Sequence, residues 1–246
     1  MILTGAAGEL GYRAGEQLHR SGYGVLLLDI EAVQHEYLRR RLDSADPRLT
    51  EYLVDLSSED SLKSTLDKIT VDPYALINMA GMKVFGQFDA LDAGLFNKVI
   101  AVNLLAPVQL CRWALPRMPP GGVILNVASA AAFSAPQDYT AYSASKFGLL
   151  GFSLALADEL RGSGIRLNTL CPHTVATSEF IKREGITDSR RLVPVERLNN
   201  TILKLLSPNS NTHGHNIRFF RLRNLAGSIF RDVKRWIKDV SDMIEF

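Results

Sequence analysis

Short apolar runs alternate with longer periodic segments along most of this chain of 246 residues. The runs lie between turn residues and the longer segments repeat with helical spacing, so they indicate strands and helices in turn. Strands are expected at residues 2–4, 24–29, 53–55, 75–78, 123–128, 165–170 and 216–220, and helices at 10–20, 32–42, 58–69, 95–117, 140–161 and 195–206. This alternation predicts an α/β fold, a three-layer doubly wound parallel sheet with helices on both faces.

The composition fits one domain over residues 1–246, with 46% hydrophobic and 22% charged residues. A net charge of +2 gives no nucleic-acid signature. No apolar run reaches the roughly 18 residues that cross a bilayer. Because the first apolar residues lead directly into a glycine turn, we expect no signal peptide and a cytoplasmic location. Cys111 and Cys171 sit in apolar runs and are expected to be buried free thiols.

Tyr142 and Lys146 stand four residues apart, a spacing that places two side chains on one helical face. A phenol is a poor acid–base catalyst at neutral pH because its ordinary pKa is about 10, and a nearby ammonium favours phenolate. The pair is therefore a candidate for proton transfer. Taken alone, it also fits a solvated helix face.

A glycine-rich turn with Gly5, Gly8 and Gly11 joins the first expected strand to the first expected helix. Glycines let the backbone turn sharply and approach a pyrophosphate, and the helix N-terminus offers amide donors. Only three residues precede Thr4, so the first strand is truncated or the natural start lies upstream.

Asp29 ends the second expected strand, 18 residues after Gly11, where an acid can bind ribose hydroxyls. A carboxylate there repels a 2′-phosphate and no Arg follows it, so NAD(H) is favoured over NADP(H). A simple turn residue is the alternative interpretation of Asp29. Asp55 ends the third expected strand, and small residues at 78–81 leave room for a nucleotide at the end of the fourth.

Several motifs follow one another in a fixed order: the glycine turn, Asp29, Asp55, residues 78–81, Asn103, Ser129, Tyr142 with Lys146, and residues 172–177. With these motifs the chain resembles the short-chain dehydrogenase/reductase family, in its compact single-domain branch, over residues 2–206. The resemblance implies a Rossmann fold. It also implies an NAD(P)-dependent oxidoreductase that interconverts a secondary alcohol and a ketone.

The resemblance implies a catalytic role for four residues. Ser129 would hold the substrate oxygen, and Tyr142 would donate or accept its proton. Lys146 would lower the pKa of the tyrosine and hold the nicotinamide ribose. Asn103 would support a water between Lys146 and solvent.

The cofactor-binding residues that the resemblance implies share the carboxyl edge of the expected sheet: Gly5, Gly8, Glu9, Leu10, Gly11, Asp29, Asp55, Leu56, Asn78, Ala80, Gly81, Tyr142, Lys146, Pro172, Val175 and Thr177. Asp55 would contact the adenine, whereas Val175 and Thr177 would lie near the nicotinamide carboxamide. Asn78 would stabilise the central strands. No metal site is expected, because the five histidines show no ligand spacing.

Three residues depart from the family pattern. Glu9 stands where the compact branch usually has Gly or Ala, and the resulting glycine spacing is that of the extended branch. Its carboxylate would weaken dinucleotide binding unless it points to solvent. Met79 replaces the usual second Asn of the fourth-strand motif, a packing variation. His173 replaces the usual Gly after Pro172 and would either touch substrate or narrow the nicotinamide pocket.

Residues 178–194 form a long polar connection that we interpret as a substrate lid. Its apolar members, Phe180, Ile181 and Ile186, would cover a ligand or pack down onto the protein. No group that would recognise a particular acid, sugar, steroid or acyl carrier stands out.

Residues 221–246 predict an added C-terminal amphipathic helix, with an apolar face from Ile229 to Ile244 opposite a charged one. Packing on its own domain or on a sister subunit is the favoured interpretation. A helix that binds a membrane surface or a partner, and a helix that closes the substrate pocket, are the alternatives.

The expected partner is a small-molecule alcohol or ketone. Two other functions stay open: a non-catalytic NAD(P)-binding sensor or scaffold, and a nucleotide-sugar-modifying enzyme of the extended type. The resemblance also implies a homodimer or homotetramer through the helices at 95–117 and 140–161. Leu149, Phe152, Leu156 and Leu160 fit a shared helical face, although core packing explains them equally well.

Overall fold

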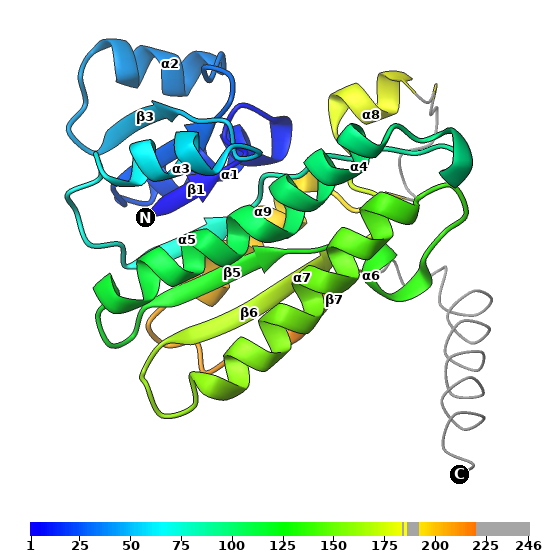
Figure 1. Ribbon diagram of the computed structural model, residues 1–246. Helices are drawn as coiled ribbons and strands as arrows, with labels where there is room; N and C mark the ends of the chain where they lie inside the picture. The colour runs from blue at the N-terminus through cyan, green and yellow to red at the C-terminus, as the bar shows by residue number, and fades with distance from the viewer. Residues whose placement is uncertain (184, 186–191, 220–246) are drawn as a thin grey trace.

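A parallel sheet of seven strands runs through the computed structural model, which describes residues 1–183, 185 and 192–219 (Figure 1). The strands are β1 Ile2–Thr4, β2 Val25–Asp29, β3 Leu49–Leu53, β4 Ala75–Asn78, β5 Val123–Val127, β6 Arg166–Pro172 and β7 Asn216–Phe219. Their order is β3-β2-β1-β4-β5-β6-β7, and every neighbouring pair is parallel. The direction of winding reverses between β1 and β4, which is where such sheets bind ligands.

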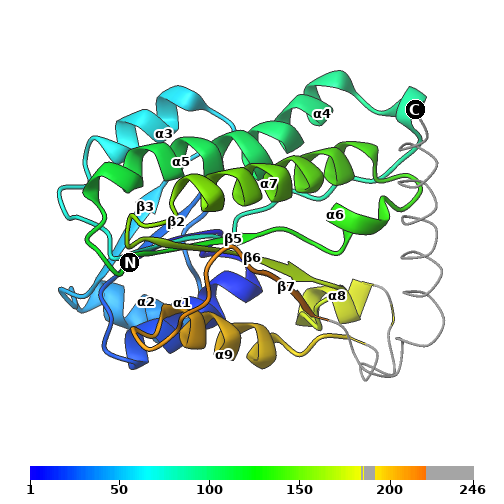
Figure 2. The ribbon, with the colours of Figure 1, turned by 90° about the horizontal axis from the view of Figure 1, so that it is seen from below.

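Helices cover both faces of the sheet. They are α1 Glu9–Arg20, α2 Glu36–Asp43, α3 Glu59–Leu66, α4 Ala93–Ile100, α5 Ala106–Ala114, α6 Ala131–Ser134, α7 Thr140–Glu159, α8 Ser178–Arg183 and α9 Val195–Leu206. Figure 2 shows α3, α4, α5 and α7 on one face and α1, α2 and α9 on the other. The expected three-layer α/β fold is therefore confirmed.

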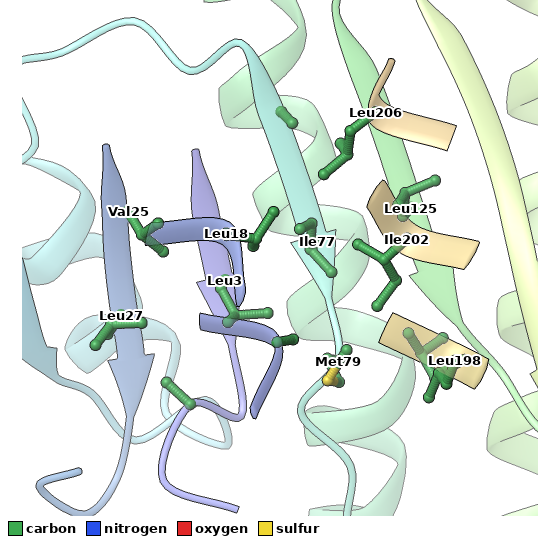
Figure 3. Close-up of a cluster of buried hydrophobic side chains, with 14 of the residues drawn as sticks. Leu3, Leu18, Val25, Leu27, Ile77, Met79, Leu125, Leu198, Ile202 and Leu206 are labelled. Atoms are coloured by element: carbon green, nitrogen blue, oxygen red, sulfur yellow. The ribbon is translucent and has the colours of Figure 1, made fainter. Parts of the chain in front are cut away.

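The central strands are apolar on both sides because both of their faces are buried. Figure 3 shows one side of this core, where strand side chains meet helices α1 and α9: Leu3, Val25, Leu27, Ile77 and Leu125 from strands, with Leu18, Leu198, Ile202 and Leu206 from helices. Alternate strand residues such as Ile2, Leu76 and Ile124 point to the opposite face, toward α3 and α5. Burial of one such side chain contributes about 1.5–3 kcal/mol.

Two expected elements are misplaced. Strand β3 covers Leu49–Leu53 rather than residues 53–55, and it pairs in register with Val25–Asp29. Asp55 therefore lies beyond the strand and does not end it. Helix α2 begins at Glu36 rather than at residue 32, because the Glu51 carboxylate accepts the Val33 amide at 2.6 Å and holds this segment extended.

The helix expected at 95–117 begins earlier, at Ala93, where the Asp92 carboxylate caps it by accepting the Leu95 amide at 2.8 Å. It is also irregular, because a π-helical turn, Ala101–Leu105, joins α4 to α5. By length and composition alone residues 93–117 could cross a membrane, but α5 packs against α3 and β4. This segment is therefore consistent with an ordinary core helix.

Core packing explains the apolar residues of α7 that fitted a shared helical face. Leu149 is buried, and Phe152, Leu156 and Leu160 pack against core clusters. The large apolar side chains that α7 exposes are instead Phe147 and Leu154.

The connection expected at 178–194 begins with a helix, α8, that sequence reasoning did not predict. The two ends of the connection meet, because Val175 and Val193 form an isolated parallel bridge and the Ala176 amide donates to the Val193 carbonyl at 2.8 Å. Strand β6 continues to Pro172, further than expected. The C-terminal helix expected at 221–246 lies outside the described residues.

Candidate active site

The expected proton-transfer pair lies on α7, beside the end of β5. Tyr142 and Lys146 are one turn apart, and the lysine Nζ is 5.8 Å from the centroid of the tyrosine ring. Lys146 is buried, and its Nζ donates to the Val127 carbonyl at 2.8 Å. Ser129 follows β5 and lines the same cleft as the pair. Three of the four expected catalytic residues therefore meet in one place.

Burial decides the pKa of both groups. Desolvation raises the pKa of the Tyr142 phenol, and the neighbouring Ser129 hydroxyl opposes this shift in part. Desolvation lowers the pKa of Lys146 to about 8. The expected lowering of the tyrosine pKa is wrong for this structure, because burial disfavours phenolate by more than the surrounding groups favour it.

Asn103 is buried within the π-helical turn and lies behind the pair. Its Oδ1 accepts the Met82 amide at 2.7 Å, and its Nδ2 donates to the Met82 carbonyl at 2.8 Å and to the Ser145 Oγ at 2.9 Å. Asn103 thus joins the loop after β4 to α7. Ser145 was not predicted as a site residue. The one sequence feature that could have indicated it is its place between Tyr142 and Lys146.

The glycine turn is closed by contacts that only glycine permits. Gly5 has φ +74°, and a Cβ there would lie 2.7 Å from the Cα of Ala80. A Cβ on Gly11 would overlap the Gly5 carbonyl oxygen. Gly8 caps α1 without any side-chain hydrogen bond, and a Cβ there would meet only the Gly5 oxygen, at 3.6 Å. The first amides of α1 are therefore open to an anion, as a dinucleotide pyrophosphate requires.

Two carboxylates lie along the same edge as the turn. Asp29 accepts the Ala7 amide at 2.9 Å and the Ile30 amide at 2.7 Å, so it ties the glycine turn to the end of β2. Asp55 accepts the Ser57 hydroxyl at 2.6 Å and the Ser57 amide at 2.8 Å, and these bonds lower its pKa. We call the glycine turn with Asp29 and Asp55 the glycine edge.

A buried polar network holds the strands beneath this edge. The Thr4 Oγ1 accepts the amides of Met79 and Ala80, each at 3.0 Å. Asn78 donates to Asn126 at 2.8 Å, and Asn126 donates to the Ser153 Oγ at 2.8 Å. Asn78 thus links the central strands to α7, as expected of a supporting residue. Met79 is buried in the core, which agrees with a packing variation.

The Glu9 side chain is largely buried and bonds to the start of α8. Its side chain is only 10% exposed. The carboxylate accepts the Ser178 amide at 2.5 Å, the Ser178 hydroxyl at 3.1 Å and the Arg13 Nε at 3.1 Å. Glu9, the first residue of α1, is therefore bonded to Ser178, the first residue of α8. Sequence reasoning considered a carboxylate in solvent or beside the pyrophosphate, and did not predict this contact.

The cleft has a volume of about 510 Å³. Eight expected site residues line it: Leu10, Gly81, Ser129, Tyr142, Lys146, Pro172, Val175 and Thr177. The other expected residues do not line it but lie along the adjoining edge or beneath it: Gly5, Gly8, Glu9, Gly11, Asp29, Asp55, Leu56, Asn78, Ala80 and Asn103. In Figure 1 and Figure 2, α6 and α8 lie at the end of the sheet to which the strand arrows point.

A second cavity of about 530 Å³ lies between α1 and α2. Its walls include Arg20, His35, Tyr37 and Arg41, and none of the expected site residues. The chemistry described above belongs to the first cavity, where the proton-transfer pair lies.

Sequence reasoning missed part of the cleft wall. Lys83, Tyr139, His173 and Phe180 also line the cleft, and we call them the aromatic wall. From the sequence, His173 and Phe180 were named without a single role for either, and Lys83 was not predicted. The signal that was available for Lys83 is its place two residues after Gly81, on the loop that follows β4.

Comparisons with known proteins agree with this geometry. The family model for short chain dehydrogenases matches residues 1–184. The short chain dehydrogenase ausX of Penicillium brasilianum is 32% identical over 77% of this chain and 73% of its own length. D-threitol dehydrogenase of Mycolicibacterium smegmatis is 30% identical over 72% of this chain and 70% of its own. Among solved structures, 4-hydroxyisoleucine dehydrogenase complexed with NADH and succinate has a TM-score of 0.77 and 26% identity, and the match covers 89% of this chain and 97% of that chain.

Proposed function

Because the chain belongs to the short-chain dehydrogenase family, we propose that it interconverts a secondary alcohol and a ketone with a nicotinamide cofactor, and that Tyr142 is the general acid–base. One observation carries the proposal: Ser129, Tyr142 and Lys146 meet in a cleft at the carboxyl edge of the sheet. The similarity to dehydrogenases that act on small molecules supports it.

NAD(H) is the cofactor that the glycine edge fits best. The amides at the start of α1 would hold its pyrophosphate, Asp29 its adenosine ribose and Asp55 its adenine, while Val175 and Thr177 would lie near the nicotinamide. When bound, the nicotinamide gives or takes a hydride at the substrate carbon. A 2′-phosphate would meet the Asp29 carboxylate and gain no arginine, since Ile30 and Glu31 follow it. A related structure that contains NADH supports binding of a nicotinamide cofactor.

The residues of the cleft would move one proton. In alcohol oxidation the Tyr142 phenolate accepts the proton of the substrate hydroxyl, and in ketone reduction the phenol returns it. Ser129 would hold the substrate oxygen by a hydrogen bond. Because burial raises the pKa of Tyr142, phenolate is disfavoured here, and the Lys146 ammonium beside the ring would offset part of that penalty.

The Tyr142→Phe substitution tests this role directly. It removes the hydroxyl that carries the proton and keeps the ring, so we expect kcat to fall about 10²- to 10⁴-fold while the NADH dissociation constant stays the same. A panel of secondary alcohols and ketones, followed by NADH absorbance, measures kcat, and calorimetry measures binding. Undiminished turnover by the variant would refute the mechanism. Failure of the natural protein to bind either NADH or NADPH would refute the cofactor assignment.

We also propose a homodimer or homotetramer formed through the helical segment at 93–117 and α7. The exposed apolar side chains Leu105, Phe147 and Leu154 support it, since they lie on the π-helical turn and on α7 and are 49%, 45% and 42% exposed. Light scattering of the purified protein measures the state. A monomer at every concentration would contradict this proposal and leave the chemistry above unaffected.

A further inference from the structure

Lys83 is a charged residue of the cleft that the proposed reaction does not use. Its Nζ lies 4.9 Å from the centroid of the Tyr139 ring and 5.9 Å from the centroid of the Phe180 ring. Within residues 1–183, 185 and 192–219, no carboxylate is within ion-pair distance of it. The ammonium is exposed at the mouth of the cleft. It therefore has aromatic neighbours and, in the described part of the chain, no counter-ion.

The position of Lys83 places it at the reacting end of the cleft. The Tyr139 ring contacts the ring of Tyr142 edge to face, with 6.3 Å between centroids. On its other side Tyr139 stacks with Phe85 at 6.1 Å. Asp29 and Asp55 line no part of this cavity. A ligand that reaches Tyr142 through this mouth would therefore pass Lys83 and Tyr139.

The backbone beside Lys83 is fixed to the catalytic turn. The residue before Lys83 is Met82. The Asn103 side chain forms hydrogen bonds with both the amide and the carbonyl of Met82, and with Ser145 on α7. The loop that carries Lys83 is thus tied to the helix that carries Tyr142. Such anchoring keeps a recognition group at a set distance from the reacting group.

The charge of the cleft has one sign. Lys83 and Lys146 line it, His173 adds an imidazole, and none of the described lining residues is Asp or Glu. A cleft with charges of one sign and low-dielectric walls concentrates its field on the opposite charge. An anionic ligand is therefore favoured at this mouth over a neutral one of the same shape, and an amine is disfavoured.

We propose that Lys83 binds a carboxylate of the substrate, so that the substrate is a hydroxy acid or the matching keto acid. A carboxylate fits better than a phosphate monoester, because Lys83 is one point charge and no arginine fork lines the cleft within the described residues. The identity of the reacting group rests on the proposed function, but the anion site itself does not.

A matched series of substrates tests the site. Keto acids of increasing length, from pyruvate to levulinate, are each compared with their methyl ester, and NADH absorbance gives kcat/KM. We expect the best acid to exceed its ester by about tenfold or more. Lys83→Met should bring that ratio close to one by raising KM for the acid, and Lys83→Arg should keep most of it. Lys68→Met, at an exposed lysine just beyond α3, is the matched control and should keep the ratio.

The outcomes separate the two proposals. If the protein binds NADH but turns over neither this series nor the panel of alcohols and ketones, the oxidoreductase proposal fails, and the anion site is then judged by calorimetric titration with the same acids. Binding that disappears in Lys83→Met and persists in Lys83→Arg supports the site. Esters that equal acids in the natural protein, or equal binding of acids by Lys83→Met, would overturn it. Unfolding by urea checks that Lys83→Met is folded.

Discussion

The aromatic wall lines the cleft and the glycine edge adjoins it, and the two are built in different ways. The edge is made of backbone: Gly5 and Gly11 are enclosed by main-chain atoms, and Thr4 bonds two amides of the next strand. The wall is made of side chains on loops and on a short helix, and Lys83 and His173 are exposed. A backbone site leaves few choices of residue, whereas a side-chain site can vary. The edge should therefore tolerate few substitutions, whereas the wall should tolerate more.

Breaking the edge should have the largest effect. A Cβ at position 11 overlaps the Gly5 carbonyl oxygen, so Gly11→Ala must displace the turn, and we expect a loss of about 3–5 kcal/mol in the free energy of unfolding. NADH binding should be lost with it. Gly151→Ala is the matched control, because nothing lies within 4 Å of that position on α7 and alanine favours a helix. Urea unfolding measures both, and equal stabilities would contradict the backbone account of the edge.

The charge of the edge should set cofactor preference. Asp29→Asn keeps an oxygen that can accept the Ala7 amide but removes the negative charge near the expected ribose. We expect NADPH to gain about tenfold in affinity relative to NADH. The free energy of unfolding should fall by about 1–3 kcal/mol, because the Asn Nδ2 would face the Ile30 amide, which loses its acceptor. Calorimetric titration with both cofactors gives the ratio. An unchanged ratio would show that Asp29 is only a turn residue.

Glu9 joins the edge to the start of α8, so its loss should separate the two regions. Glu9→Ala leaves the Ser178 amide without its carboxylate acceptor, and a lost helix-end acceptor contributes about 0.5–2 kcal/mol. We expect a KM for substrate that rises severalfold, with NADH affinity unchanged because the Glu9 carboxylate bonds Ser178 and Arg13. Glu9→Gln keeps an acceptor and should stay closer to the natural protein. A weaker affinity for NADH with an unchanged KM would place Glu9 in the cofactor site instead.

A further effect should appear as a dependence of stability on pH. The pKa of Lys146 is lowered from 10.5 to about 8 by burial, so between these values the unfolded chain binds more protons than the folded protein. Deprotonation of Lys146 therefore makes the free energy of unfolding rise with pH between about 8 and 10.5. Above 10.5 it no longer contributes to the slope. Lys146→Met should therefore flatten the rise, as urea unfolding at several pH values would reveal. Tyr142, whose pKa is raised, acts in the opposite direction only above pH 10, so the measurement stays below it.

The sequence predicted the layers of the fold because β1, β2, β4 and β5 are buried on both faces and appear as continuous apolar runs. It misplaced β3, an edge strand in which only Leu49 is buried, Leu53 is exposed and Glu51 interrupts the apolar pattern. The π-helical turn at Asn103 was invisible, since one extra residue per turn leaves no mark in an apolar helix.

Within the site, the motifs predicted residues whose partners are near in sequence or fixed by the fold, such as Tyr142 with Lys146. They did not predict contacts between distant segments, such as Glu9 with Ser178, which are 169 positions apart. The tyrosine pKa was misjudged for a related reason, because desolvation depends on all the surrounding elements. The cytoplasmic location stays a prediction.

The π-helical turn at Ala101–Leu105 puts one extra residue into an otherwise regular helix. A regular helix with one residue fewer would be the simpler and more stable solution for this segment, with the same α5 packed on the sheet. It would also lose the bulge that aims Asn103 at Met82 and Ser145. The turn thus gives up helix regularity for the contacts that Asn103 makes with the loop after β4 and with α7.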